Sequence, residues 1–182
     1  MFSAPIEFEG KILDIDPVEV SRRILAAGGE QLGAERLMRR YVYDMRPKVH
    51  DQWIRLRDNG NEITLAVKQV SNDAVDGTHE TEIVVGNFED TNTMLGLLGF
   101  TPKSYQENRR VSFLYAGARL EIDTWPLISP YLEIEAESVA DVHRVAALLG
   151  YPADRVTGEN TMDIYARRGI DVSTVPALRF SR

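Results

Sequence analysis

The sequence predicts an α+β fold in which about eight strands, most of them antiparallel neighbours, carry three inserted helices. Two observations lead to this prediction. Short runs in which apolar and charged residues alternate recur along the chain, as in half-buried strands. Between them lie three segments with apolar residues at helical spacing, each opened by a capping side chain and stopped at a glycine.

The expected strands cover residues 6–15, 36–45, 52–58, 62–70, 79–85, 103–115, 117–124 and 131–137. The sequence DNGNE at 58–62 predicts a hairpin turn between two of them, because Asn-Gly suits the backbone of a tight turn. A further short helix is expected over 159–168. We expect residues 1–170 to form a single domain, followed by a loose tail over 171–182.

Each of the three inserted helices has a recognisable start and stop. The starts are side chains that accept hydrogen bonds from the first backbone N–H groups, and they are Asp16, Asn87 and Ser138. Pro17 stands in the first helical position after Asp16, where proline is favoured. The stops are Gly28, Gly99 and Gly150.

The composition limits the functions that the chain can have. At 182 residues it is long enough for one domain with its own core, and a net charge of −7 argues against a general nucleic-acid binder. It has no Cys, which excludes disulfides, thiol nucleophiles and thiolate metal sites. No stretch reaches the roughly 20 apolar residues that span a bilayer. We therefore expect a cytoplasmic monomer or homodimer that binds neither nucleic acid nor membrane.

Charged residues collect on one face of the expected strands, because alternate residues of a strand point the same way. The sets are Glu7, Glu9 and Lys11; Arg55 and Arg57; Lys68; Glu80 and Glu82; Glu121 and Asp123; and Glu133 and Glu135. For any single strand, a solvated face over a core is the simpler interpretation. Taken together, the sets favour a functional interpretation instead. Acids cluster on some strands and bases on others, whereas solvated faces usually mix both signs. If the helices cover the outside of a closed sheet, the charged side is its interior.

An eight-stranded barrel is just wide enough to hold one small ligand. Like charges in such an interior stay ionised only if metals and a polyanion balance them. Paired carboxylates offer oxygen ligands that suit Mg²⁺ or Mn²⁺, and Arg and Lys bind phosphate oxygens. These are the components that phosphoryl transfer requires.

Seven segments, EFEGK and six others, resemble in the family's order the strand motifs of the CYTH superfamily, the triphosphate tunnel metalloenzymes. EFEGK at 7–11 is similar to the family's E-x-E-x-K signature. The other similar segments are RRYVYDMRP, WIRLR, ITLAVKQ, the acidic HETE and YLEIE, and LEID. The superfamily includes class IV adenylate cyclases, thiamine-triphosphatases and inorganic triphosphatases.

The resemblance implies an eight-stranded antiparallel closed tunnel, with helices packed outside, that binds a small-molecule triphosphate with Mg²⁺ or Mn²⁺. It assigns phosphate binding to Lys11, Arg55, Arg57, Lys68 and Arg110. It assigns metal binding to Glu7, Glu9, Asp123, Glu133 and Glu135. The catalytic roles fall to Glu9, Glu135 and Lys11. Further candidates are Glu80, Glu82, Glu121 and Arg109.

Two departures from the family pattern bear on function. Asn108 stands where the family often has a lysine, so either one phosphate contact is lost or Arg109 substitutes for it. The sequence TWPLISPY at 124–131 replaces a short glycine-containing turn, and loops at this position would select the organic part of the substrate.

Three functions are compatible with these motifs. The first is metal-dependent hydrolysis of inorganic triphosphate, a nucleoside triphosphate or thiamine triphosphate, in which Glu9 or Glu135 orients the attacking water. The second is cyclisation of ATP to cyclic AMP and pyrophosphate, as in class IV adenylate cyclases. The third is a non-catalytic module that binds a polyphosphate or nucleotide, which Asn108 favours.

Overall fold

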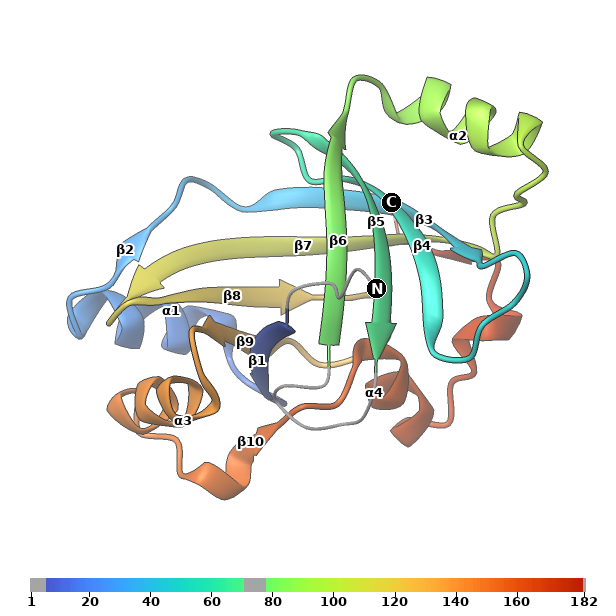
Figure 1. Ribbon diagram of the computed structural model, residues 1–182. Helices are drawn as coiled ribbons and strands as arrows, with labels where there is room; N and C mark the ends of the chain where they lie inside the picture. The colour runs from blue at the N-terminus through green and yellow to red at the C-terminus, as the bar shows by residue number, and fades with distance from the viewer. Residues whose placement is uncertain (1–5, 71–77, 182) are drawn as a thin grey trace.

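The computed structural model describes residues 6–70 and 78–181, which form a curved sheet flanked by helices (Figure 1). The strands are β1 (Ile6–Ile12), β2 (Glu30–Gln31), β3 (Arg36–Asp44), β4 (Gln52–Asp58), β5 (Ile63–Val70), β6 (Thr78–Val85), β7 (Ser104–Tyr115), β8 (Ala118–Thr124), β9 (Tyr131–Ala136), β10 (Val156–Thr157) and β11 (Ala177–Leu178). The α-helices are α1 (Pro17–Ala26), α2 (Phe88–Leu97), α3 (Val139–Leu148) and α4 (Thr161–Arg167), and the 3₁₀ helices are η1 (Ala153–Arg155) and η2 (Val172–Thr174). The α+β class and the eight longer strands are as predicted.

All the described strands belong to one sheet. Its order is β10-β1-β6-β5-β4-β3-β7-β8-β9, and the short strands β2 and β11 both pair with β7. Neighbouring strands are antiparallel, with the exception of the parallel pair of β11 and β7. The short strands β2, β10 and β11 were not predicted, since two residues are too few to produce an alternating pattern.

The prediction of a closed eight-stranded barrel is wrong, because the sheet has eleven strands and is not closed along its length. β1 pairs with β9 over residues 8–12, and among the described residues it pairs with β6 at Ile6 and Glu7. Lys11 and Ile12 pair with β10 on that side. The short strand β10 therefore borders this end of β1 in place of a long strand. Alternation defines the two faces of a strand, but it does not determine which strands meet at the edges.

The predicted helix starts are confirmed. The Asp16 carboxylate accepts hydrogen bonds from the backbone N–H groups of Val18, at 2.8 Å, and Glu19, at 3.1 Å. Asn87 caps α2 and Ser138 caps α3 in the same way. The glycines at 28, 99 and 150 all have positive φ angles, which a residue with a Cβ rarely adopts. The local sequence therefore sets both ends of α1, α2 and α3.

Two apolar clusters fix these helices against the same face of the sheet (Figure 1). α1 and α3 lie side by side on β1, β7, β8 and β9, where Leu120 and Ile134 are completely buried. α2 covers β3, β4 and β5, with Phe88 and Leu95 packed against Leu56. Because alternate residues point to opposite faces, the apolar residues under the helices leave the charged residues of the same strands on the other face.

The chain after residue 170 is packed rather than loose, which corrects the expectation for the tail over 171–182. Val172 and Leu178 are buried in a third cluster with Trp125, Tyr131 and Tyr165, and β11 extends the sheet beside β7. The sequence of this segment is too short and irregular to display a period, so its packing had no signal in the sequence. Residue 182 lies outside the described residues.

Within residues 6–70 and 78–181, no helix has the length and apolar character needed to cross a membrane. The longest helices have ten residues each.

Leu120→Ala tests the position of the core. The side chain is fully buried under α1 and α3, so the truncation is expected to lower the free energy of unfolding by about 2–5 kcal/mol. The measurement is urea unfolding at equilibrium. The matched control is Leu97→Ala in α2, where the side chain is 85% exposed and the expected change is within about 0.5 kcal/mol. Equal effects at the two positions would contradict this description of the core.

Candidate functional site

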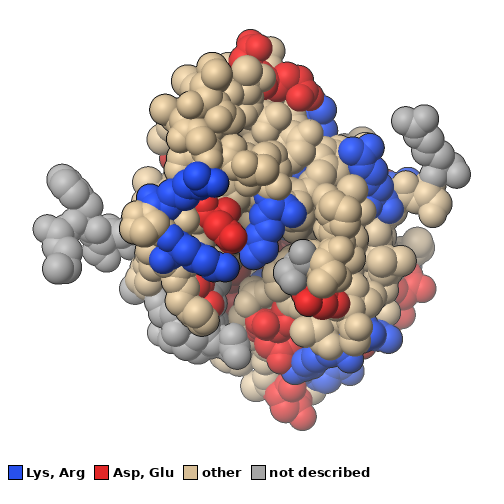
Figure 2. Space-filling model, turned by 90° about the vertical axis from the view of Figure 1, so that its right-hand side faces the viewer, with Lys and Arg blue, Asp and Glu red and all other residues tan. Residues whose placement is uncertain are grey.

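Charged side chains from eight strands share the face that α1, α2 and α3 leave uncovered. We call this the charged face, and its described members are Glu9, Lys11, Arg36, Arg40, Arg55, Arg57, Lys68, Glu80, Glu82, Arg110, Arg119, Glu121, Asp123, Glu133 and Glu135. The strand register places many of them directly opposite one another, and directly opposed residues of paired strands lie on one face. In the space-filling view, basic and acidic side chains lie next to one another around a hollow (Figure 2).

Arg110 on β7 is the centre of the acidic part of this face, which β1, β8 and β9 form. Its guanidinium donates two hydrogen bonds to the Asp123 carboxylate, from Nε at 2.7 Å and from Nη2 at 2.6 Å. It also forms ion pairs with Glu121 and, at 3.4 Å, with Glu133. Burial alone would lower the pKa of Arg110, but Asp123 and Glu133 outweigh it and raise that pKa above its ordinary value. Three residues to which the resemblance assigns a role, together with the further candidate Glu121, therefore meet here.

Lys11 occupies the neighbouring position on β1. Its ammonium lies 3.2 Å from Glu133 and 3.6 Å from Glu9. Burial would lower the pKa of Lys11, but these two carboxylates outweigh it and raise the pKa. Burial would likewise raise the pKa of Glu133, yet Lys11 and Arg110 hold it at about 2. Both groups therefore remain charged at neutral pH although they are buried.

The basic part of the charged face lies on β3, β4 and β5, next to the two glutamates of β6. Arg55 and Lys68 share Glu80, with nitrogen–oxygen distances of 2.5 and 2.8 Å. Arg57 lies 3.0 Å from Glu82. Burial would raise the pKa of Glu80, but Arg55 and Lys68 lower it to about 2. Three of the predicted phosphate-binding residues are thus brought together, with Glu80 and Glu82 as their present partners.

Glu9 and Glu135 are direct neighbours across the pair of β1 and β9. Glu135 is exposed on its strand, but desolvation by its neighbours and the nearby charges of Glu133 and Glu9 raise its pKa above its ordinary value. Two facing carboxylates repel each other, and a divalent cation would relieve that repulsion. No group of three or more described Asp, Glu or His side chains is arranged as a metal cage. Mg²⁺ commonly binds through one or two carboxylates together with substrate phosphates, and this pair fits that pattern.

Three basic residues of the charged face were not predicted. They are Arg36, Arg40 and Arg119. Arg36 donates to the Ser112 hydroxyl at 2.9 Å, and Arg119 pairs with Glu121 at 3.1 Å. The signal for Arg36 and Arg40 was present, since they are separated by four residues within one strand and so share a face. It was obscured by Arg39, which lies on the opposite face.

Two other predictions about site residues need correction or completion. Arg109 cannot substitute for a lysine at position 108, because it lies on the opposite face of β7, where its guanidinium stacks on Phe180. Asn108 itself is completely buried; it donates to Asp123 at 2.9 Å and accepts from Arg40. The side chain of Glu7, a predicted metal ligand, lies outside the described residues.

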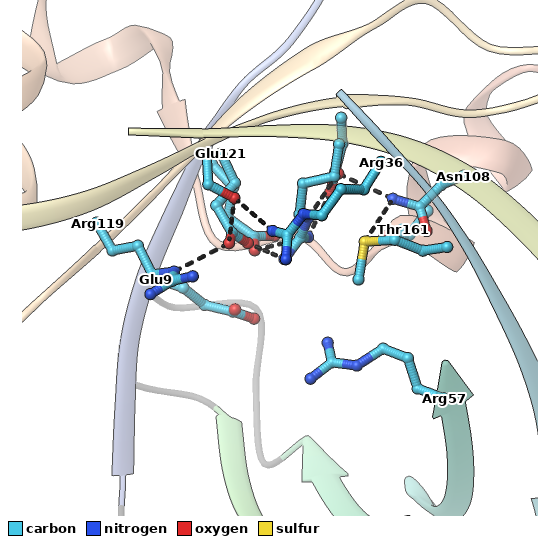
Figure 3. A network of polar contacts seen from close by, with 12 residues as sticks. Glu9, Arg36, Arg57, Asn108, Arg119, Glu121 and Thr161 are labelled. Carbon is cyan, nitrogen blue, oxygen red and sulfur yellow. Dashed lines mark hydrogen bonds and ion pairs between the residues drawn. The ribbon is translucent and has the colours of Figure 1, made fainter. Parts of the chain in front are cut away.

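Figure 3 shows how the parts face one another. Arg36 and Glu121 point toward one group of charged side chains, and the Arg57 guanidinium extends toward that group from the opposite side. Glu9 lies below Glu121, on the same side as Arg119. A separate open pocket of about 360 Å³, between the β4–β5 turn and the end of β6, contains none of the predicted site residues. The convergence of opposite charges therefore identifies the charged face as the candidate site.

Glu80→Gln tests the ion pairs of the basic part. A carboxyl group whose pKa falls from 4.5 to about 2 on folding stabilises the protein above pH 4.5, and this contribution is lost as the pH falls toward 2. The wild-type protein is therefore expected to lose more unfolding free energy than the variant between about pH 7 and about pH 3. Urea unfolding at both pH values measures the difference. Glu62→Gln, at an exposed glutamate of the β4–β5 turn, is expected to behave like wild type. Identical acid dependence in all three proteins would contradict the proposed role of Glu80.

Comparison with known proteins agrees with this geometry. Three solved structures similar in fold illustrate it. A conserved hypothetical protein from Pyrococcus furiosus has a TM-score of 0.74 and 19% identity, covering 87% of this chain and 99% of that one. A proposed adenylate cyclase from Vibrio parahaemolyticus has a TM-score of 0.72 and 11% identity, covering 90% and 99%. A proposed adenylyl cyclase from Hippeastrum, described as having a dominant triphosphatase activity, has a TM-score of 0.59 and 16% identity, covering 90% and 96%.

The similarity of these structures concerns the fold alone, and a search of curated proteins finds no match. The family is established by the sequence instead. A family model for the CYTH domain matches residues 5–151, which include every strand from β1 to β9. The resemblance of the strand motifs to this family is thereby confirmed, and the chain belongs to the CYTH domain family.

Proposed function

We propose that this protein hydrolyses a small molecule bearing a triphosphate, in a reaction that depends on a divalent metal ion. The observation that supports this most directly is the division of the charged face. Bases predominate on β3, β4 and β5, acids predominate on β1, β8 and β9, and the two parts face each other. A polyphosphate with its metal ion carries the complementary pair of charges.

The phosphate oxygens would be held by Lys11, Arg55, Arg57, Lys68 and Arg110. Each of these side chains now pairs with a carboxylate of the same face. Substrate phosphates would therefore compete with carboxylates for cations that are already oriented, so little reorganisation is required on binding. Of these five cations, Arg110 is held most strongly by its carboxylate partner, because two of its nitrogens donate short hydrogen bonds to Asp123.

The metal ion would be held by Glu9 and Glu135, with Glu133, Asp123 and Glu7 as further ligands. Mg²⁺ or Mn²⁺ bound there supplies Lewis-acid neutralisation of charge on the phosphate oxygens. The raised pKa of Glu135 makes this carboxylate a better proton acceptor than an ordinary glutamate, which suits a general base.

The chemical step is an in-line displacement. A water oxygen bonds to the terminal phosphorus while the bond from that phosphorus to the bridging oxygen breaks. The water proton passes to Glu135 or Glu9. The remaining diphosphate portion of the substrate leaves with the bridging oxygen, and the terminal phosphoryl group leaves as orthophosphate. Lys11 and Arg110 stabilise the negative charge that develops on the phosphate oxygens.

Cyclisation of ATP is the second candidate, supported by the fold shared with the proposed adenylate cyclase from Vibrio parahaemolyticus. In that reaction the ribose 3′-hydroxyl attacks the α-phosphate and expels pyrophosphate. The phosphate-binding residues would be the same, and the products would differ.

The first experiment is incubation of the purified protein with tripolyphosphate, ATP and thiamine triphosphate, with Mg²⁺ or Mn²⁺ and with product identification. We expect orthophosphate release that EDTA abolishes. We expect Glu9→Gln to lower kcat/KM by about 100-fold or more, the range for loss of a general base or metal ligand. Glu62→Gln serves as the control with unchanged activity. If the products are cyclic AMP and pyrophosphate, the reaction is cyclisation and not hydrolysis. If the compounds bind tightly but no product forms, the protein is a binding module.

A neighbouring pair of arginines offers a matched test of the charged face. Arg110→Gln removes a cation from this face, whereas Arg109→Gln removes one from the opposite face of the same strand. The first is expected to reduce kcat/KM by about tenfold or more, since a charge-assisted hydrogen bond is lost, and the second by less than about twofold. Urea unfolding reports whether each variant is folded. Equal kinetic effects of the two substitutions would contradict the assignment.

A further inference from the structure

Arg40 on β3 differs from the other buried cations of the charged face. Only 7% of the residue is exposed, yet it forms no ion pair with a carboxylate among the described side chains. Arg55, Arg57 and Arg110 all have such partners. The Nε atom of Arg40 is buried without a hydrogen-bond acceptor, as are those of Arg36, Arg55 and Arg57, so the missing ion pair is what distinguishes Arg40. A buried charge without a counter-charge is costly, and a buried donor normally has a partner.

The contacts of Asn108 explain why Arg40 lacks a counter-charge. The amide oxygen of Asn108 accepts from the Arg40 guanidinium, and its amide nitrogen donates to Asp123 at 2.9 Å. Asn108 thus lies between the Arg40 guanidinium and the Asp123 carboxylate, and it separates the two charges. Asp123 is already engaged by two nitrogens of Arg110. The positive charge of Arg40 is therefore held in place without an ion pair of its own, and Asp123 acts on it only from behind Asn108.

Several other positive charges lie close to the Arg40 guanidinium. Its guanidinium stacks on Trp125 at 4.6 Å from the ring centroid. Burial, followed by the charges of Arg55, Arg57 and Arg110, lowers the pKa of Arg40 to about 9, which leaves it protonated at neutral pH. Nearby like charges disfavour the charged form of each group, and an anion bound between them would relieve this repulsion.

Trp125 also closes this end of the charged face. It is 4% exposed, Asn108 is completely buried, and the aromatic cluster of Trp125 with Tyr131 and Tyr165 lies beneath α4. The Trp125 indole donates to the Tyr131 hydroxyl at 2.9 Å, and Tyr165 donates to the carbonyl of Pro126 at 2.6 Å. The ring stacked on Arg40 is therefore fixed in place, and a group bound to Arg40 has packed aromatic side chains behind it.

From these observations we infer that Arg40, positioned by Asn108 and Trp125, binds the terminal phosphate of the substrate. Because Trp125 stacks on Arg40 and is itself packed against Tyr131 and Tyr165, the phosphate bound by Arg40 would be the last of its chain, so the ligand would have one free phosphate end. This inference rests on the proposed function, since it assigns one part of the same substrate to one residue. Under this inference Arg40 determines specificity, because Arg40 would distinguish a triphosphate with a free end from a triphosphate that is capped at both ends.

The test is isothermal titration calorimetry of the full chain with tripolyphosphate in the absence of metal. Arg40→Met is expected to weaken binding by about tenfold or more, the loss for one charge-assisted hydrogen bond. Arg40→Lys keeps the charge and is expected to lose less. Arg39→Met removes an arginine from the opposite face of the same strand, where it pairs with Asp58 and Glu89, and is expected to bind within about twofold of wild type.

A compensating substitution separates binding from a structural role. Asn108→Lys places an ammonium at the side chain that now contacts the Arg40 guanidinium. The double variant of Arg40→Met and Asn108→Lys is therefore expected to recover most of the lost affinity, which a merely structural arginine would not allow. Absence of recovery in a folded double variant overturns the proposal, as does unchanged binding in Arg40→Met. If Arg40→Met does not fold, Arg40→Lys and the double variant decide the question.

Diadenosine triphosphate, which has both ends capped, tests the terminal assignment. It is expected to bind more weakly than tripolyphosphate and to show no dependence on Arg40. Tight, Arg40-dependent binding of the capped compound overturns the assignment. The outcomes also separate this inference from the proposed function. Hydrolysis by wild type with binding that ignores Arg40 overturns only the inference, whereas Arg40-dependent binding without turnover overturns only the hydrolase.

Discussion

The buried charge of Asp123 is the constraint on which the charged face depends. The carboxylate is completely inaccessible to solvent, where an isolated charge would be strongly destabilising. Arg110 engages both of its oxygens, and Asn108 donates to one of them. Arg110 in turn reaches Glu133, and Glu133 holds Lys11. A single buried charge therefore organises a chain of ion pairs that extends from β8 to β7, β9 and β1.

The apolar core supplies the rigidity that these pairs require. Leu120 and Ile122 alternate with Glu121 and Asp123 along β8, so the same backbone packs under the helices and presents the carboxylates. Side-chain positions on one face are thus fixed by packing on the other. This coupling has a functional meaning, because groups oriented before the substrate arrives stabilise charge without the cost of reorganisation. The geometry of the charged face therefore depends on apolar residues that lie on the opposite face of the same strands.

Much of the fold could be predicted from local patterns, because caps, glycine stops and alternation are local properties. The structure confirms the starts of α1, α2 and α3 and brings together most of the predicted charged residues. Edge pairing is a non-local property, and so the closure of the sheet was predicted wrongly. Arg109 and Arg110 show the limit for side chains. Adjacent arginines look equivalent in the sequence, but a single step along a strand puts them on opposite faces.

The ion pairs of the charged face have a mechanical consequence. Arg55 on β4 and Lys68 on β5 share Glu80 on β6, and Arg57 pairs with Glu82 on β6. Side chains as well as backbone hydrogen bonds therefore join these three strands. A polyanion that replaced the carboxylates as the partner of these cations would join the strands through itself, so the stiffness of this part of the sheet depends on what the cations bind.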